Sequence, residues 1–241
     1  MYQIVKREQF SDVTFLWDVY APDVARSARP GHFVMVRLNE GGERIPLTVA
    51  DYDPEWGTVT IVIQALGKTT KEMMRDFKEG DSFSDFVGPL GLESHVGKVG
   101  HVVLVGGGLG VAPIFPQLRA FKEAGNRTTG IIGFRNKDLV FWEDRFKRYC
   151  DDLIVCTDDG SYGRKALVTE PLKELCQRSP RPDLAVAIGP PIMMKFCAET
   201  PRPFAVPTVV SLNTIMVGGT GMCGGCRVSV GGETRFVCVD G

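Results

Sequence analysis

Residues 101–125 read HVVLVGGGLGVAPIFPQLRAFKEAG, and this stretch decides the fold of the second half of the chain. An apolar run, 101–108, ends in glycines and is followed by a helical pattern that stops at Gly125. Glycines at such a junction let the backbone approach a diphosphate, which free N–H groups at the helix start stabilise. Pro113 suits the first turn because its missing N–H is not needed there. The stretch therefore predicts a strand, a phosphate-binding turn and a helix.

The alternation of strand and helix continues downstream. Strands are expected at 128–135, 152–160 and 183–190, and helices at 143–150, 170–178 and 191–199. Strands and helices that take turns along a chain are typical of βαβ units and a parallel sheet. The next segment, TPRPFAVPTVV at 200–210, is rich in proline and is expected to be an extended linker.

The first ~95 residues have a different rhythm, of short β-rich runs broken by Gly, Pro, Asp and Asn. These runs are expected strands at 3–10, 13–21, 32–38, 58–66 and 81–89, with one helix at 69–77. The pattern predicts a small antiparallel β-barrel. The predicted organisation is a barrel domain at 1–97, an α/β domain with a parallel sheet at 98–210, and a cysteine-containing loop region at 211–241.

Composition restricts the class of protein. The 241 residues include 44% hydrophobic and 24% charged residues, as in a globular protein with a core, and the formal net charge is −1. No basic surface favours nucleic acid or an anionic membrane, no apolar run could span a bilayer, and the N-terminus lacks the apolar core of a signal peptide. We expect a cytoplasmic protein whose scattered cysteines are buried reduced thiols, namely Cys150, Cys156, Cys176 and Cys197.

Two stretches of the first domain suit anionic and ring-shaped ligands. RIPLTVAD, 44–51, places an arginine before an extended strand; an arginine can neutralise a diphosphate, and such a strand can hydrogen-bond an isoalloxazine ring. QALGKTTKE, 64–72, supplies Gly, Lys and two Thr at a helix start, which is a second anion site by the same physics. Each signal is weak by itself, since an exposed arginine before a strand is common.

Two loops of the second domain lie where α/β sheets bind ligands. IGPPIMM, 188–194, ends a strand in Gly-Pro at the carboxyl edge of the sheet, beside which a nicotinamide could lie. TDDGSYGRK, 157–165, offers two acids, Asp158 and Asp159, as acceptors for ribose hydroxyls. The same loop offers Arg164 and Lys165, which could hold a 2′-phosphate, so the choice between the two nucleotides stays open.

Three cysteines gather in the C-terminal segment. Cys223 and Cys226 form a C-x2-C pair, and Cys238 follows after 11 residues. A plant-type [2Fe–2S] frame is C-x4-C-x2-C followed by a fourth cysteine, and its first position here is Gly218. A fourth ligand could be water or hydroxide, Thr220, Asp240 or a residue of a partner chain. A labile cluster, a zinc site and idle thiols are the remaining interpretations.

Taken together, these motifs resemble the ferredoxin–NADP reductase superfamily, in which a flavin-binding barrel is joined to a domain that binds a nicotinamide nucleotide. The resemblance covers essentially the whole chain. The cysteine segment narrows it to the branch with an iron–sulfur extension, which includes the electron-transfer subunit of dihydroorotate dehydrogenase. That branch also includes the small subunit of the NADH-dependent reduced ferredoxin:NADP oxidoreductase, or sulfide dehydrogenase, which the run MCGGCRV at 222–228 resembles more closely.

The resemblance implies three cofactors: FAD, NAD(H), with NADP(H) as the alternative, and a [2Fe–2S] cluster. At the position of Gly218, the electron-transfer subunit of dihydroorotate dehydrogenase has a cysteine, and the small subunit of the ferredoxin:NADP oxidoreductase has an aspartate. The expected cofactor-binding residues are Arg44, Pro46, Leu47, Thr48, Ile63, Ala65, Gly67, Thr69, Thr70, Gly107, Gly108, Gly110, Val111, Pro113, Asp158, Gly189 and Pro190. The expected metal ligands are Cys223, Cys226 and Cys238.

The expected function follows from electron counting. A nicotinamide gives two electrons as a hydride, a cluster takes one at a time, and a flavin can do both, so the flavin belongs between them. Electrons would pass from NADH through FAD and the cluster to a larger flavin and iron–sulfur subunit, and several such complexes bifurcate electrons. No catalytic acid or base is expected. The alternatives are an NADPH-dependent reductase and a regulatory nucleotide-binding subunit without the cluster, which only Gly218 favours.

Overall fold

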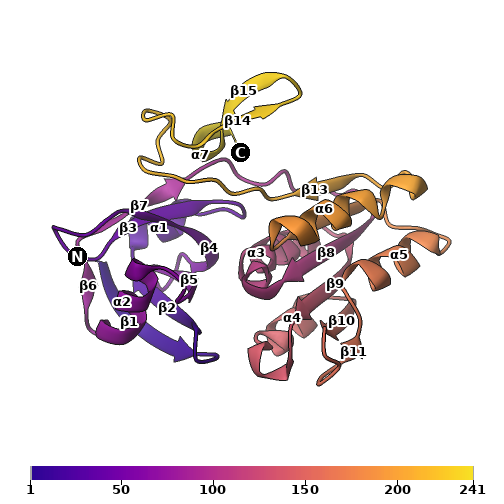
Figure 1. Cartoon of the computed structure of the whole chain (residues 1–241), viewed down its shortest axis with the longest axis horizontal. Coiled ribbons are helices and arrows are strands. Elements are labelled where there is room, and N and C mark those ends of the chain that lie inside the picture. Colours follow the sequence, from indigo (N-terminus) through magenta and orange to yellow (C-terminus); the bar gives the residue numbers. More distant parts are fainter. Residues whose placement is uncertain (1, 241) are drawn as a thin grey trace. The chain divides into compact units, whose positions relative to one another are not determined.

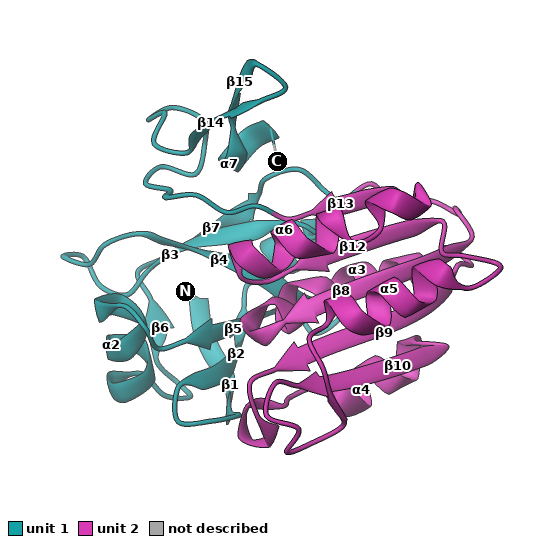
Figure 2. Ribbon diagram, turned by 45° about the vertical axis from the view of Figure 1, so that its right-hand side comes forward, with its two compact units in different colours: residues 1–94, 212–241 teal, residues 95–211 magenta. Residues whose placement is uncertain are grey.

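The computed structural model describes residues 2–240 and divides into two compact units. Residues 1–94 and 212–241 form the first unit, and residues 95–211 form the second (Figure 2). The predicted fold class is confirmed: an antiparallel barrel, a parallel α/β sheet and a C-terminal cysteine segment. No helix within residues 2–240 combines the length and the apolar character needed to cross a bilayer.

The first unit is built on a seven-stranded sheet whose order is β6-β1-β2-β5-β4-β3-β7 (Figure 1). All of its pairs are antiparallel. The strands are β1 (Tyr2–Gln9), β2 (Thr14–Tyr20), β3 (Phe33–Arg37), β4 (Ile45–Asp53), β5 (Thr58–Gln64), β6 (Ser82–Phe83) and β7 (Asp85–Leu90). The two edge strands, β6 and β7, are separated in sequence by Ser84 alone, so the sheet nearly closes on itself.

The barrel interior explains the β-rich runs of the sequence. Side chains from facing strands fill it, with Phe15 and Trp17 of β2 against Phe83 and Phe86. Helix α2 (Lys68–Asp76) lies within one residue of the helix expected from the sequence and buries Met73 in the same core. Helix α1 (Pro22–Ser27) was not predicted, because six residues are too few to show a periodic apolar pattern.

The second unit is a six-stranded, wholly parallel sheet with the order β11-β10-β9-β8-β12-β13. The strands are β8 (His101–Gly107), β9 (Arg127–Phe134), β10 (Asp152–Thr157), β11 (Arg164–Lys165), β12 (Leu184–Ile188) and β13 (Thr208–Val210). The helices are η1 (Gly108–Gly110), α3 (Val111–Glu123), η2 (Lys137–Leu139), α4 (Glu143–Tyr149), α5 (Thr169–Gln177), α6 (Pro191–Glu199) and η3 (Arg202–Phe204). The expectation of a linker at 200–210 was wrong, because β13 pairs with β12 and extends the sheet.

The strand order sets where this unit can bind a ligand. The chain starts at β8, builds β9, β10 and β11 on one side, and then returns to place β12 and β13 on the other side. Right-handed crossovers put helices on opposite faces when the direction reverses, and accordingly α3 packs on α4 while α5 packs on α6. The reversal lies between β8 and β12, so the crevice beyond their carboxyl ends is the expected binding place.

The C-terminal segment packs on the barrel within the first unit. It forms a hairpin of β14 (Arg227–Val230) and β15 (Glu233–Phe236) and a final turn of helix, α7 (Val237–Asp240). The hairpin turn uses Gly231 and Gly232, both at positive φ, as a two-residue turn requires. Its cysteines share an apolar cluster with barrel residues; the members are Phe33, Met35, Leu90, Met216, Cys226, Phe236, Val237 and Cys238.

Candidate functional site

The hairpin explains the 11-residue spacing between the last two cysteines. Cys226 lies just before β14 and Cys238 just after β15, and the ladder pairs Arg227 with Phe236 between them. Val237 N–H then donates to the Cys226 carbonyl at 3.2 Å, which brings the two cysteines side by side. Their Sγ atoms lie 3.2 Å apart, and both side chains are buried. The sequence spacing is therefore the length of one hairpin that closes a thiol pair.

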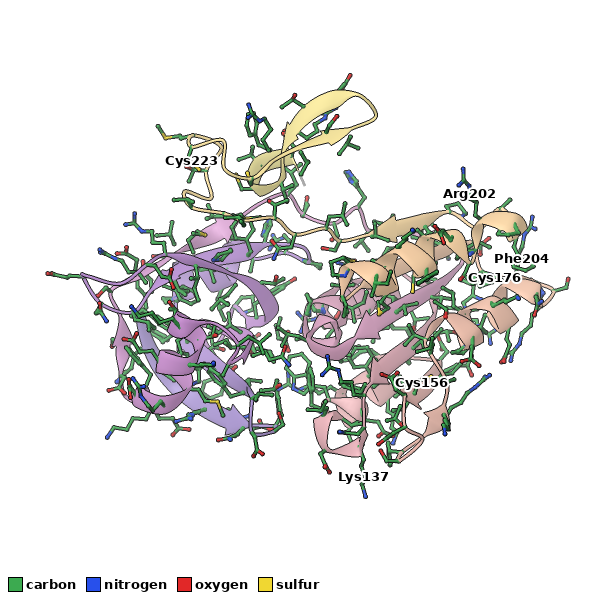
Figure 3. The ribbon with its side chains drawn as sticks, viewed as in Figure 1. Lys137, Cys156, Cys176, Arg202, Phe204 and Cys223 are labelled. Carbon is green, nitrogen blue, oxygen red and sulfur yellow. The ribbon has the colours of Figure 1, made fainter. Side chains whose placement is uncertain are left out.

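Cys223 lies on the exposed side of the same segment (Figure 3). Backbone N–H groups of Gly225 and Gly218 hold the pKa of the Cys223 thiol below its ordinary value. Burial raises the pKa of the Cys238 thiol, and the Gly221 N–H donates to its Sγ at 3.2 Å. Backbone N–H groups thus point at sulfur on both sides of the segment, the environment that iron–sulfur clusters use to tune their potential.

The three C-terminal thiols do not surround one point in this structure. Among residues 2–240, no group of three or more His, Cys, Asp or Glu side chains is arranged to hold one metal ion. Cys226 and Cys238 form one pair, which agrees with the two ligand pairs that a [2Fe–2S] cluster uses. The Asp240 carboxylate accepts the Phe236 N–H at 2.6 Å and caps the hairpin, so it is engaged in a structural contact.

Of the four remaining cysteines, three are buried as the sequence predicts, whereas Cys150 is only half-buried. All seven cysteines are free thiols, and Cys156, Cys176 and Cys197 are buried in the apolar core of the second unit. Burial raises the pKa of the Cys197 thiol to about 12 and that of the Cys156 thiol to about 11. Thiols in this environment stay protonated at neutral pH and are poor nucleophiles and ligands.

The glycine-rich turn and the Gly-Pro turn meet at the predicted binding edge of the second unit. A Cβ atom at Gly110 would overlap the carbonyl oxygen of Ile188 and lie 2.8 Å from the Gly189 Cα atom. The turn after β8 and the end of β12 therefore touch backbone to backbone, which only glycine allows. Gly108 has φ +54° within η1. Val111, which was also predicted, is the first residue of α3.

A methionine fills the space between the same two turns. A Cβ atom at Gly107 would overlap the Met193 sulfur and lie 3.4 Å from Pro190 Cδ. A Cβ atom at Gly189 would lie 2.8 Å from Met193 Cε and 3.2 Å from the Gly107 carbonyl oxygen. Met193 was not predicted as a site residue, although it stands in the quoted stretch 188–194. Pro113 lies in the first turn of α3, as expected.

The acidic loop after β10 is partly committed to its own turn. Asp159 Oδ1 accepts the N–H of Ser161 at 2.9 Å and its hydroxyl at 2.7 Å, and these bonds hold the pKa of Asp159 below its ordinary value. Asp158 is exposed and follows the last residue of β10, at the carboxyl edge of the sheet. Asp158 therefore keeps the placement needed of an acceptor for ribose hydroxyls.

Arg164, which the sequence offers as a ligand for a 2′-phosphate, forms an ion pair with Glu174. Its two terminal nitrogens donate to the Glu174 carboxylate at 2.8 and 2.5 Å, a bidentate contact from β11 to α5. This contact raises the pKa of Arg164 and lowers that of Glu174. Sequence reasoning missed this partner, because ten residues and the start of a helix separate Glu174 from Arg164.

On the barrel, Arg44 is also held by a carboxylate. Its Nε and Nη2 atoms donate to Asp85 Oδ2 at 3.0 and 2.7 Å, and Arg37 Nη2 donates to Asp85 Oδ1 at 3.2 Å. The two arginines, Arg44 first, hold the pKa of Asp85 below its ordinary value. Asp85 was missed by sequence reasoning, since it lies 41 residues from Arg44 in the chain.

The start of α2 is the second place where the sequence predicts an anion site, and two carboxylates, Glu43 and Glu72, lie beside it. Thr70 Oγ1 accepts the N–H groups of Leu66 and Gly67 at 3.1 and 3.0 Å and so fixes the turn before the helix. Thr69 donates its hydroxyl to the Glu43 carboxylate. A cavity of about 380 Å³ lies here. Its lining residues are Leu38, Asn39, Gly41, Gly42, Glu43, Lys68, Thr69 and Glu72.

The remaining predicted flavin residues divide by burial. Ile63 and Ala65 are buried in the barrel core, so only their backbone can contact a ligand. Pro46 and Leu47 are half-buried on β4, and Thr48 is exposed. Among the predicted flavin residues, Arg44, the first part of β4, Gly67 and Thr70 are thus at least partly accessible, whereas Thr69 is buried.

Comparison with known proteins agrees with this site. Residues 213–241 match the family model for the iron-sulfur cluster binding domain of dihydroorotate dehydrogenase B. A Thermotoga maritima protein, a dihydroorotate dehydrogenase B (NAD(+)) electron transfer subunit homolog, is 50% identical over 239 residues, 99% of this chain and 84% of that protein. The electron transfer subunit of dihydroorotate dehydrogenase B (NAD(+)) from Fusobacterium nucleatum is 32% identical over 242 residues, 97% of this chain and 91% of that protein.

Solved structures give the same assignment. The structure of an NADH-dependent reduced ferredoxin-NADP oxidoreductase, studied for flavin-based electron bifurcation, superposes with a TM-score of 0.93 at 49% identity. It covers 100% of this chain and 86% of that chain. Phthalate dioxygenase reductase, at 14% identity and a TM-score of 0.67, covers 99% of this chain and 93% of that chain and shares the fold.

Fold and site together define a class of oxidoreductase in which a ferredoxin–NADP-reductase-like barrel and α/β sheet carry an iron–sulfur segment. The chain belongs to the family of dihydroorotate dehydrogenase B electron-transfer subunits and their homologues. The resemblance seen in the sequence is confirmed. At the level of this family, the expected cofactor set of FAD, NAD(H) and a [2Fe–2S] cluster is confirmed as well.

Replacing Gly110 with alanine should disrupt the nucleotide turn. The added methyl group overlaps the Ile188 carbonyl, so we expect a loss of about 1–3 kcal/mol of stability from overpacking and a large loss of NADH affinity. FAD should stay bound, because the barrel is a separate unit. Gly97→Ala, where a Cβ meets nothing within 4 Å, is the matched control in thermal unfolding and NADH titration. Unchanged NADH affinity in Gly110→Ala would contradict this account of the turn.

Removing either member of the buried thiol pair should remove iron. We expect Cys226→Ser and Cys238→Ser to lose most bound iron and sulfide after anaerobic purification, because each leaves one thiol to hold its side of the cluster. Cys150→Ser, at a half-buried cysteine of the second unit, should keep the full content. Iron and sulfide analysis, with the FAD content as internal standard, measures the effect. Equal iron in all three variants would refute the assignment of this pair.

Proposed function

We propose that this chain passes electrons between NAD(H), FAD and a [2Fe–2S] cluster to a larger flavin and iron–sulfur partner subunit. Two observations together carry the proposal. In the second unit, the turn at Gly110 touches the backbone at Gly189 at the carboxyl edge of the sheet. In the first unit, the sulfur atoms of Cys226 and Cys238 lie side by side. One unit is thus suited to a dinucleotide, and the other to a flavin and a cluster. Bound FAD would convert the two-electron chemistry of the nicotinamide into the one-electron chemistry of the cluster.

Each part of the chain has a defined task in this proposal. Gly107, Gly108, Gly110 and the start of α3 would hold the dinucleotide diphosphate, because free N–H groups at the helix start favour anions. Arg44 and the turn that Thr70 fixes would hold the FAD diphosphate, and the exposed face of β4 would face the flavin. None of these residues would have to exchange a proton, and the sequence likewise predicts no catalytic acid or base.

The cluster segment also offers a docking surface for the partner. Ile215, Val217 and Met222 belong to this segment and are 80%, 62% and 91% exposed. Large apolar side chains that stay in water beside a redox site are typical of an interaction surface. The partner we propose is the larger subunit of an oxidoreductase complex that accepts or delivers single electrons. A bifurcating complex is one form of this assembly, with the bifurcating flavin then in the partner.

We place this complex in the cytoplasm, where the free thiols of the second unit stay reduced.

We propose NADH as the nucleotide rather than NADPH. The carboxylate of Glu174 already neutralises Arg164, so a 2′-phosphate would have to break a bidentate contact to use that arginine. The exposed Asp158 on the same loop suits ribose hydroxyls and repels a phosphate.

The proposal is tested by following the flavin and the cluster together. NADH added anaerobically to the purified chain should bleach the flavin band near 450 nm and then produce the EPR signal of a reduced [2Fe–2S] cluster. NADPH should do so more slowly. A protein that binds no FAD, or whose flavin is reduced by neither nucleotide, would overturn the proposal. A flavin reduced without any cluster signal would favour the regulatory subunit considered from the sequence.

Releasing Arg164 should shift the nucleotide preference. In Glu174→Gln the guanidinium loses its ionic partner, and we expect the kcat/KM ratio of NADPH to NADH to rise by about twofold to fivefold, as for one exposed ion pair. Glu123→Gln removes an exposed carboxylate from the last turn of α3 and should leave the ratio unchanged. The effect should shrink at high salt. An unchanged ratio in Glu174→Gln at low salt would show that Arg164 lies away from the 2′-position.

A further inference from the structure

The four positions of the cysteine frame form two pairs in space. Cys226 and Cys238 form the buried pair, with their Sγ atoms 3.2 Å apart. The other two positions are residue 218 and Cys223, and a Cβ atom at residue 218 would lie 3.5 Å from Cys223 Sγ. A side chain at 218 would therefore lie in contact with the Cys223 sulfur. The frame thus provides one ligand pair for each iron of a two-iron cluster, and the second pair lacks a member.

The incomplete pair lies on the solvent side. Cys223 is exposed and Gly218 is half-buried, whereas both members of the complete pair are at most 2% exposed. Thr220 has the side-chain oxygen near this position, 3.9 Å from the Cβ point of residue 218. Water and small solutes can reach such a place, and they cannot reach the buried pair.

We propose that the cluster of this protein is asymmetric, with an open coordination position at Gly218. In this proposal one iron is bound by the buried pair, Cys226 and Cys238. The other iron has Cys223 as its one side-chain ligand. A small exogenous ligand completes the coordination of this second iron, and in the resting protein that ligand is water or hydroxide. An added thiolate or imidazole replaces that ligand. This inference rests on the proposed function, since it needs the [2Fe–2S] cluster to be present.

The backbone at residue 218 makes the proposal testable, because it accepts a side chain without strain. Gly218 lies outside the positive-φ region that favours glycine, and the nearest atoms to an added Cβ stand at ordinary van der Waals distance. Its neighbours differ: Gly219 and Gly221 have φ +77° and +81°, and a Cβ at Gly219 would lie 2.8 Å from Met35 Cγ. Gly218→Cys and Gly218→Asp can therefore supply the missing ligand, and Gly218→Ala adds the carbon alone.

The experiment reads the open position directly. The full chain is purified anaerobically, by itself and with the partner that co-purifies, and is reduced with dithionite in H₂¹⁷O. In the wild-type protein and Gly218→Ala we expect ¹⁷O hyperfine coupling in the electron–nuclear double resonance spectrum of the cluster. Titration with 2-mercaptoethanol or imidazole should shift their absorption and EPR signals. In Gly218→Cys and Gly218→Asp the ¹⁷O coupling and the response to added ligands should both disappear.

Several results would overturn the inference. A wild-type cluster without ¹⁷O coupling, alone or in the complex, would mean that a side chain of this chain or of the partner fills the position. Thr220→Val tests the nearest such side chain: we expect it to keep the ¹⁷O signal, and a changed cluster spectrum there would assign the ligand to the Thr220 hydroxyl. The failure of the proposed function looks different, because then iron and sulfide are missing from the wild-type protein and Gly218→Cys alike.

Discussion

The contact between the Cys226 and Cys238 sulfur atoms is the constraint on which the functional account depends. The contact exists because a tight glycine turn joins two four-residue strands into a hairpin. It is buried because the two cysteines pack with Phe33 and Met35 of the barrel. Burial of two protonated thiols in an apolar cluster is favourable by itself, since a free cysteine packs as a small hydrophobe. In the proposed cluster both would be bound as thiolates, and metal coordination would offset the cost of burying their charge. The hairpin and its barrel contact therefore position the thiol pair that the proposed cluster would use.

A second theme is that the two arginines predicted to bind anions are held by carboxylates. Asp85 holds Arg44 on the barrel, and Glu174 holds Arg164 on the sheet. The two pairs differ in surroundings. Asp85 also binds Arg37, so it carries two cations and keeps net positive charge near Arg44 for a diphosphate. Glu174 has Arg164 as its closest partner and cancels it. In the proposed function, the same kind of contact would orient Arg44 for a diphosphate in one unit and keep Arg164 from a 2′-phosphate in the other.

Local patterns in the sequence predicted local structure well, and distant contacts poorly. The run 101–125 predicted its strand, turn and helix, because the glycines, the apolar run and the helical period are all encoded within it. The strand Thr208–Val210 was missed because three residues in a proline-rich stretch become a strand only by pairing with β12. The same holds for Asp85 and Glu174, whose partners depend on the tertiary fold. Ile63 and Ala65 were predicted as ligand contacts, and burial of their side chains in the barrel core leaves only their backbone for such a contact.

The place of the missing ligand also has a physical logic. Losing a thiolate from the buried side would leave an under-coordinated iron in an apolar site, where no solvent can replace it and unpaired charge is costly. Losing it at residue 218 leaves the iron beside water, in reach of backbone N–H groups that already point at Cys223. Fewer thiolates also leave the cluster less negative, which makes an added electron easier to hold. Of the four frame positions, 218 is therefore one where a glycine can be tolerated and can change the redox behaviour without unfolding the segment.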